Sequence, residues 1–125
     1  MADDPIPGDL QDFIVRYIDS IAQLEALLLL RAHPSESWDA KRTAARLYAG
    51  AAEVSELLTR LCADGFLALH EGAYRYACRS PEQQAMVDRL AEAYSRRLIP
   101  VTNLIHAKPR RIREFSDAFK FRKDR

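Results

Sequence analysis

The fold that this sequence predicts is decided by the stretch VSELLTRLCADGFL at residues 54–67. Its apolar residues between Val54 and Leu61 recur at spacings of three and four, which is typical of an amphipathic helix with one buried face. Gly65 stands where helices commonly end in a left-handed residue, and two apolar residues follow it at once. The stretch therefore predicts a helix over 51–63 that passes through a glycine turn into extended chain.

A β-hairpin is expected directly after this helix. Residues 66–70 and 73–77 form two short segments that are separated by Glu71-Gly72. In the second segment Tyr74 and Tyr76 alternate with small or charged residues, as they would in a strand. The two-residue glycine turn between the segments favours a tight hairpin.

Another helix is expected on the N-terminal side, from Trp38-Asp39 to about Tyr48. Asp39 or Ser37 suits the N-cap position, because short polar side chains accept hydrogen bonds from the free N–H groups of the first turn. Gly50 lies between this helix and the next. A tight turn there needs a residue that tolerates a positive φ.

The first helix of the chain is expected to run without a break from Asp9 to about Ala32. Its apolar residues step by three and four from Leu10 to Leu28, which predicts a single amphipathic stripe. His33-Pro34 ends the helix, because proline disfavours helical geometry in the residue before it.

The C-terminal third opens with a strong helix start, Ser80-Pro81-Glu82-Gln83. It combines an N-cap serine, a proline at the first helical position and a glutamine placed for a capping box. Pro100 removes a backbone donor and predicts a kink or break near Leu98. After Pro109 the chain continues as a basic segment with three phenylalanines.

The chain of 125 residues fits one domain. We expect a flexible arm over residues 1–8 and a domain of helices and hairpin over 9–79. A kinked helix for packing or dimerisation is expected over 80–107, and a basic Phe-rich tail segment over 108–125.

Charge is spread unevenly, although the net charge is only +1. Residues 1–40 hold eight acids and two bases, whereas residues 108–125 hold eight bases and three acids. Such asymmetry points to a nucleic-acid partner or to a self-complementary assembly. The near-neutral total argues against nucleic acid, since many DNA-binding domains are plainly basic.

A cytoplasmic location is expected. The longest apolar run, Ala26 to Leu30, is far too short to span a bilayer. The acidic N-terminus lacks the basic start of a signal peptide. Cys62 and Cys78 suit a reducing compartment as small buried side chains, with a redox pair as the alternative.

The motifs of catalysis and cofactor binding are absent from the sequence. His33, His70 and His106 show no metal-ligand spacing, and no GxGxxG, GxxxxGK or GxSxG pattern occurs. We therefore expect no enzymatic activity, no metal and no cofactor.

The order of helices, turns and hairpin resembles the winged helix-turn-helix family of transcriptional regulators. The stretches WDAKRTAARL at 38–47, VSELLTRL at 54–61 and DGFL at 64–67 carry the resemblance, which covers roughly residues 10–78. It implies a mainly α fold with a two-stranded β-hairpin wing and additional C-terminal helices. The tail FSDAFKFRK at 115–123 is similar to the ending of a group of small bacterial winged-helix proteins of ill-defined function, which implies a bacterial cytoplasmic protein.

The resemblance implies a DNA-binding transcriptional regulator whose helix over 51–63 enters the major groove. The outer face of that helix is poor in the side chains that usually read bases, and Glu53 and Glu56 would oppose phosphate. As alternatives, the lysine and arginine side chains are solvated surface charges, and the tyrosines of the hairpin are cross-strand packing residues. The residues expected to contact double-stranded DNA are Lys41, Arg42, Arg46, Ser55, Glu56, Thr59, Arg60, Tyr74 and Arg75.

The helix over 80–107 is expected to support a homodimer, because its apolar residues approximate an a/d seam. Packing within one chain against residues 10–30 is the alternative. The residues of the predicted seam are Val87, Leu90, Tyr94, Leu98, Val101 and Ile105.

A second hypothesis is a winged-helix protein–protein interaction module without sequence-specific DNA binding. Its partner would dock on the acidic face of the helix over 51–63 or on the segment 110–123, whose phenylalanines are interleaved with basic residues. Folding of that segment back onto the domain is the other interpretation.

Overall fold

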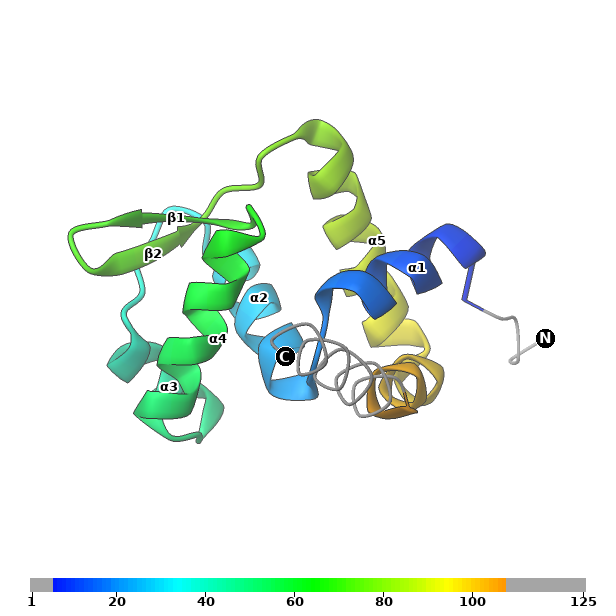
Figure 1. The fold of residues 1–125 in the computed structure, drawn as a ribbon, viewed down its shortest axis with the longest axis horizontal. Helices are drawn as coiled ribbons and strands as arrows, with labels where there is room; N and C mark the ends of the chain where they lie inside the picture. The colour runs from blue at the N-terminus through cyan, green and yellow to red at the C-terminus, as the bar shows by residue number, and fades with distance from the viewer. Residues whose placement is uncertain (1–5, 108–125) are drawn as a thin grey trace, which may run out of the picture.

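The computed structural model describes residues 6–107 and is mainly helical, with a two-stranded antiparallel hairpin that follows four helices (Figure 1). This arrangement is winged-helix-like and confirms the predicted fold class. The elements are α1 (Gly8–Tyr17), α2 (Ile21–Ala32), α3 (Ala40–Leu47), α4 (Ala51–Ala63), β1 (Leu67–His70), β2 (Ala73–Tyr76) and α5 (Pro81–Arg96), followed by a helical stretch over 98–107.

The predicted single helix over 9–32 is wrong, because the chain breaks at residues 18–20 into α1 and α2. Ser20 caps α2 by accepting a hydrogen bond from the Gln23 N–H at 3.1 Å. The Gln23 side chain fills the break: it accepts from the Asp19 N–H at 2.6 Å and donates to the Tyr17 carbonyl at 3.2 Å. The apolar stripe continues across the break, so periodicity alone does not reveal it.

The break allows the two halves of the predicted helix to pack on different partners. Helix α1 packs against α5, whereas α2 packs against α3, α4 and β2. Figure 1 accordingly shows α1 and α5 on one side of the molecule, α2 in the middle, and α3, α4 and the hairpin on the other side.

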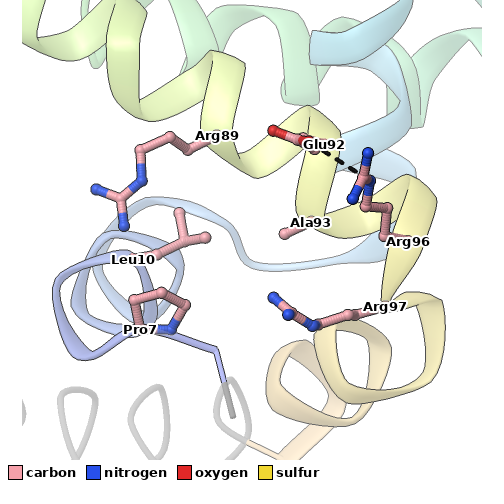
Figure 2. A pocket seen from close by; sticks show the side chains of 7 residues that line it. All are labelled: Pro7, Leu10, Arg89, Glu92, Ala93, Arg96 and Arg97. Carbon is pink, nitrogen blue, oxygen red and sulfur yellow. Dashed lines mark ion pairs between the residues drawn. The ribbon is translucent and has the colours of Figure 1, made fainter. Parts of the chain in front are cut away.

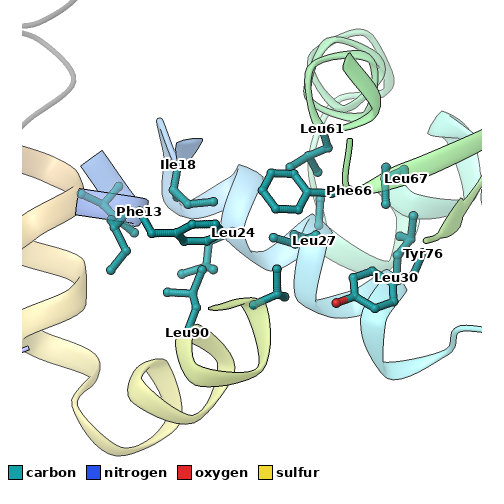
Figure 3. Close-up of a cluster of buried hydrophobic side chains, with 14 of the residues drawn as sticks. Phe13, Ile18, Leu24, Leu27, Leu30, Leu61, Phe66, Leu67, Tyr76 and Leu90 are labelled. Carbon is teal, nitrogen blue, oxygen red and sulfur yellow. The ribbon is translucent and has the colours of Figure 1, made fainter. Parts of the chain in front are cut away.

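The core is continuous through α2, whose Leu24, Leu27 and Leu30 are fully buried (Figure 3). Aromatic rings link α1 to the start of the hairpin, since Phe66 lies edge-on to Phe13 at 5.9 Å and to Tyr17 at 5.6 Å between ring centroids. One core therefore holds both sides of the molecule together.

The turn between α3 and α4 differs from the expected one. Asp39 caps α3 as predicted, by accepting from the Arg42 N–H at 2.7 Å. The positive φ falls on Tyr48, at 56°, whereas Gly50 is the N-cap of α4 with a φ of −74°. The expectation for Gly50 was wrong because α3 ends in a left-handed cap at Tyr48, with the Ala49 N–H bonded back to the Ala44 carbonyl at 3.1 Å.

The hairpin forms as predicted, with a tight turn in which Glu71 and Gly72 both have positive φ, at 52° and 80°. Two consecutive residues of this kind match the right-handed twist of the strands. The chain at Trp38 joins the hairpin as a third extended segment, and the sequence pattern did not predict this contact. Trp38 and Tyr74 form an antiparallel bridge with two N–H to carbonyl bonds of 2.7 Å.

The C-terminal helices also follow the prediction. Ser80 caps α5 by accepting from the Gln83 N–H at 3.0 Å, and Pro81 takes the first helical position. The helix ends at Arg96 and resumes at residue 98, so Pro100 lies in a first turn where its missing N–H leaves no hydrogen bond unmade. Within 6–107, no helix is long and apolar enough to cross a membrane. Most of the predicted arm and the whole tail segment lie outside the described residues.

Replacing Gly65 by alanine should lower the free energy of unfolding by about 1–2 kcal/mol. Gly65 has a φ of 90°, and an added Cβ would overlap the guanidinium of Arg79. Urea denaturation measures the loss. Gly8→Ala is the matched control, since Gly8 begins α1 and nothing lies near its missing Cβ. Equal midpoints for the two variants would contradict the prediction.

Candidate nucleic-acid interface

Helix α3 presents three basic side chains to solvent. Lys41, Arg42 and Arg46 are all exposed, and their spacing places them on one side of the helix. Thr43 and Ala44, between them, are buried against the rest of the domain. The exposed side of α3 is therefore cationic, as the sequence predicts.

Trp38 organises the arginines of α3. Its ring is fully buried, and the guanidinium carbon of Arg42 lies 3.8 Å from the ring centroid. The guanidinium of Arg46 lies over the same ring at 5.5 Å. Cations over an indole face are attracted by the ring quadrupole, so the tryptophan fixes both side chains where they meet solvent.

Arg42 has two further partners in the turn before α3. It donates to the Ser37 carbonyl at 2.8 Å and forms an ion pair with Glu36. The hydrogen bond from Arg42 holds the pKa of the Glu36 carboxyl below its usual range. Arg42 is thus well positioned, and Glu36 partly neutralises it.

Arg75 of the hairpin reaches the same turn, because its guanidinium donates to the Ser37 hydroxyl at 3.4 Å. The Trp38–Tyr74 bridge brings β2 to this place. Arg42, Arg46 and Arg75 are therefore assembled around residues 37–38 from α3 and the wing, and Lys41 lies on the same exposed side of α3. We call these four residues, Lys41, Arg42, Arg46 and Arg75, the basic cluster.

No family model, curated protein or solved structure matches this chain.

Helix α4 exposes the residues that the sequence analysis placed on its outer face, including Ser55, Glu56, Thr59 and Arg60. Arg60, however, has two carboxylate neighbours, Asp19 at 3.7 Å and Asp64 at 3.5 Å. Its charge is largely compensated before any ligand arrives.

The wing touches α4 through Tyr74, whose hydroxyl lies 3.4 Å from the Thr59 hydroxyl. Thr59 also donates to the Ser55 carbonyl at 2.9 Å. Tyr74 is half-buried and pairs with Leu69 across the hairpin, so its packing role is evident. The Tyr74 and Thr59 hydroxyls lie close to each other, and neither extends outward as the long side chains that contact nucleobases do.

An acidic groove of about 380 Å³ lies between the α1–α2 break and α4. Its carboxylates come from Asp19 beside the break and from Glu53 and Glu56 of α4, and Arg60 is the one cation among its described lining residues. A polyanion would be repelled along this side of α4, in contrast to the side of α3. The groove is lined by Asp19, Ser20, Gln23, Glu53, Glu56, Leu57 and Arg60.

A second hollow, of about 250 Å³, lies between α1 and α5, and three arginines line it (Figure 2). Arg89 forms two hydrogen bonds with Asp9, at 2.7 and 3.0 Å, and these lower the pKa of the Asp9 carboxyl. Arg96 turns toward Glu92, at 3.4 Å. Arg89 joins α5 to α1 through Asp9, whereas Arg96 pairs with Glu92 within α5, so both arginines already hold carboxylates of the chain itself.

The predicted dimer seam does not lie on the surface. Val87, Leu90, Val101 and Ile105 are fully buried within one chain and belong to its hydrophobic core. Tyr94 donates to Glu25 at 3.1 Å, and Leu98 alone of the six is more than half exposed. The alternative of packing within one chain accounts for the four buried positions, and an a/d seam open to a second subunit is wrong. Homodimerisation itself stays a prediction.

The two cysteines are the remaining candidate groups. Cys62 and Cys78 are free and half-buried, and burial raises the pKa of the Cys78 thiol. Within the described part of the chain, no three His, Cys, Asp or Glu side chains gather where they could hold a metal ion.

Proposed function

We propose that this protein is a winged-helix transcriptional regulator that binds duplex DNA mainly through its phosphate backbone. The observation that supports the proposal is the basic cluster, which unites α3 and the wing around the buried ring of Trp38. Groups held in place before binding lose less conformational entropy when a ligand arrives.

The four residues of the basic cluster have distinct roles in this proposal. Lys41 is exposed and forms no ion pair within residues 6–107, so it attracts phosphate as a point charge. Arg46 offers a planar guanidinium group that suits bidentate contact with phosphate oxygens. Arg42 already bonds the Ser37 carbonyl and Glu36, so it contributes only the charge that Glu36 leaves uncompensated. Arg75 extends the contact to the strand of DNA beside the wing.

Sequence preference should be weak. Ser55 and Thr59 offer short hydroxyls, Arg60 is paired, and the Glu56 carboxylate can accept from base amino groups, such as that of cytosine, but cannot donate. Contacts to phosphate position a protein but carry no sequence information directly. We therefore propose a strongly salt-dependent binder, and two copies on adjacent half-sites would supply the specificity that one copy lacks.

A second candidate function is a protein-interaction module, and the acidic groove between α2 and α4 is the observation that favours it. A basic segment of a partner protein would fit its charge. The Phe-rich segment 110–123, which the sequence analysis also considered for partner binding, lies outside the described residues.

Fluorescence anisotropy with a short mixed-sequence duplex tests the DNA proposal. Affinity should fall steeply between about 50 and 200 mM salt, and Lys41→Gln should reduce the slope of log affinity against log salt by about one. Arg96→Gln removes the same charge from α5, far along the chain from the cluster, and should leave the slope unchanged. Absence of binding at low salt would refute the proposal and favour the protein-interaction module.

Neutralising the acids of α4 should strengthen DNA binding. Glu53 and Glu56 are exposed on the helix that would face DNA, so a Glu53→Gln, Glu56→Gln variant removes phosphate repulsion. We expect a several-fold gain in affinity at low salt that disappears as salt screens the charges. Glu92→Gln on α5 is the control, and an equal gain from it would show only a general charge effect.

A further inference from the structure

Tyr48 occupies a position that its residue type does not favour. It has φ 56° and ψ 44° at the end of α3, in the left-handed region where helices commonly place glycine. For a bulky residue this conformation is strained. Gly50, two residues later, has a φ of −74° that any residue can adopt.

The Tyr48 side chain does not offset this strain by packing against the rest of the domain. It is 96% exposed, more than any other large hydrophobic residue among those described. An exposed aromatic ring in a strained backbone conformation has neither a packing nor a conformational reason. Strain of this kind, when it persists, is concentrated at binding and catalytic sites.

We infer that Tyr48 is a DNA-backbone contact, with its hydroxyl donating to a phosphate oxygen and its ring lying against the adjoining sugar. The inference rests on the proposed function and assigns it a residue that the sequence analysis did not select. Tyrosine hydroxyls are among the side-chain groups that contact phosphates in protein–DNA complexes.

The surroundings of Tyr48 favour a polyanion over an apolar partner. It is the residue that directly follows α3, two residues after Arg46, and α3 exposes Lys41, Arg42 and Arg46. Its exposed neighbours in the chain, Ala45, Arg46 and Gly50, supply a cation and no large apolar side chain. The adjacent apolar residues, Leu47 and Ala49, pack against the core, so Tyr48 has no large exposed apolar neighbour that would make a hydrophobic anchor site.

Two variants of Tyr48 test the inference, each measured by DNA anisotropy and by urea denaturation. Tyr48→Gly should raise the denaturation midpoint, because glycine adopts the left-handed conformation freely, and should weaken DNA binding about tenfold. Tyr48→Phe should keep the denaturation midpoint and lose about threefold to fivefold in affinity with the hydroxyl. Tyr94→Phe removes a hydroxyl from α5 and should bind DNA normally.

The outcomes separate this inference from the proposed function. If the unmodified protein binds DNA in a salt-dependent manner that Lys41→Gln weakens, but Tyr48→Gly binds as tightly, the assignment of Tyr48 is overturned and the proposed function stands. A Tyr48→Gly variant that is less stable than the unmodified protein would also overturn it, because the residue would then serve the fold. No DNA binding by the unmodified protein would overturn both.

Discussion

Trp38→Ala should lower the free energy of unfolding by about 3–5 kcal/mol, the range for truncating a fully buried tryptophan. The loss is a large part of the 5–15 kcal/mol that usually stabilises a small domain. It arises because the ring fills the space below α3 and contacts the His33 ring at 5.8 Å as well as both arginines. Thermal and urea unfolding measure the effect.

Trp38→Phe separates the loss of the ring from the loss of the indole N–H. The Nε1 atom of Trp38 is buried and has no hydrogen-bond partner among the described residues, so its removal leaves no acceptor unpaired. The cost should therefore be only about 1–2 kcal/mol, from lost volume. A phenylalanine variant as unstable as the alanine variant would show that the N–H has a partner, such as an ordered water.

Gln23→Ala should destabilise the protein by about 2–4 kcal/mol, because it removes a buried side chain that bonds two backbone groups. The Gln23 side chain bonds both Asp19 and Tyr17 across the α1–α2 break and is 1% exposed. Denaturation in urea measures the loss for the folded domain.

Gln23→Met is the control for cavity formation, since methionine has nearly the same length and no amide. It should lose most of what the alanine variant loses if the hydrogen bonds carry the effect. A methionine variant that is as stable as the unmodified protein would show that Gln23 acts by filling space.

The sequence predicts local structure well wherever one residue type decides it. Asp39, Ser80 and Gly65 each mark a helix end that the structure places within a residue or two of the expected position. The α1–α2 break escapes prediction because Ser20 and Gln23 act through hydrogen bonds, while the apolar stripe that crosses them keeps its period.

The candidate site depends on contacts that a pattern cannot supply. The sequence shows the positive charges of α3 and of Arg75. Their assembly in space requires the bridge between Trp38 and Tyr74, which are far apart in the chain. The dimer seam fails for a related reason. Apolar residues such as Val87 and Leu90 show the same spacing whether their partner is α1 or a second subunit.

The division of the first helix at residues 18–20 also has a consequence for the order of folding. The bond between Asp9 and Arg89 joins residues 80 apart, so docking α1 on α5 closes a long loop, and the entropic cost of closure rises by about 0.6 kcal/mol for each doubling of loop length. The contacts of α4 with α3 and with β1 join segments that are adjacent in the chain and cost far less. We therefore expect the contacts among α3, α4 and β1 to form early in refolding and the α1–α5 contact to form later.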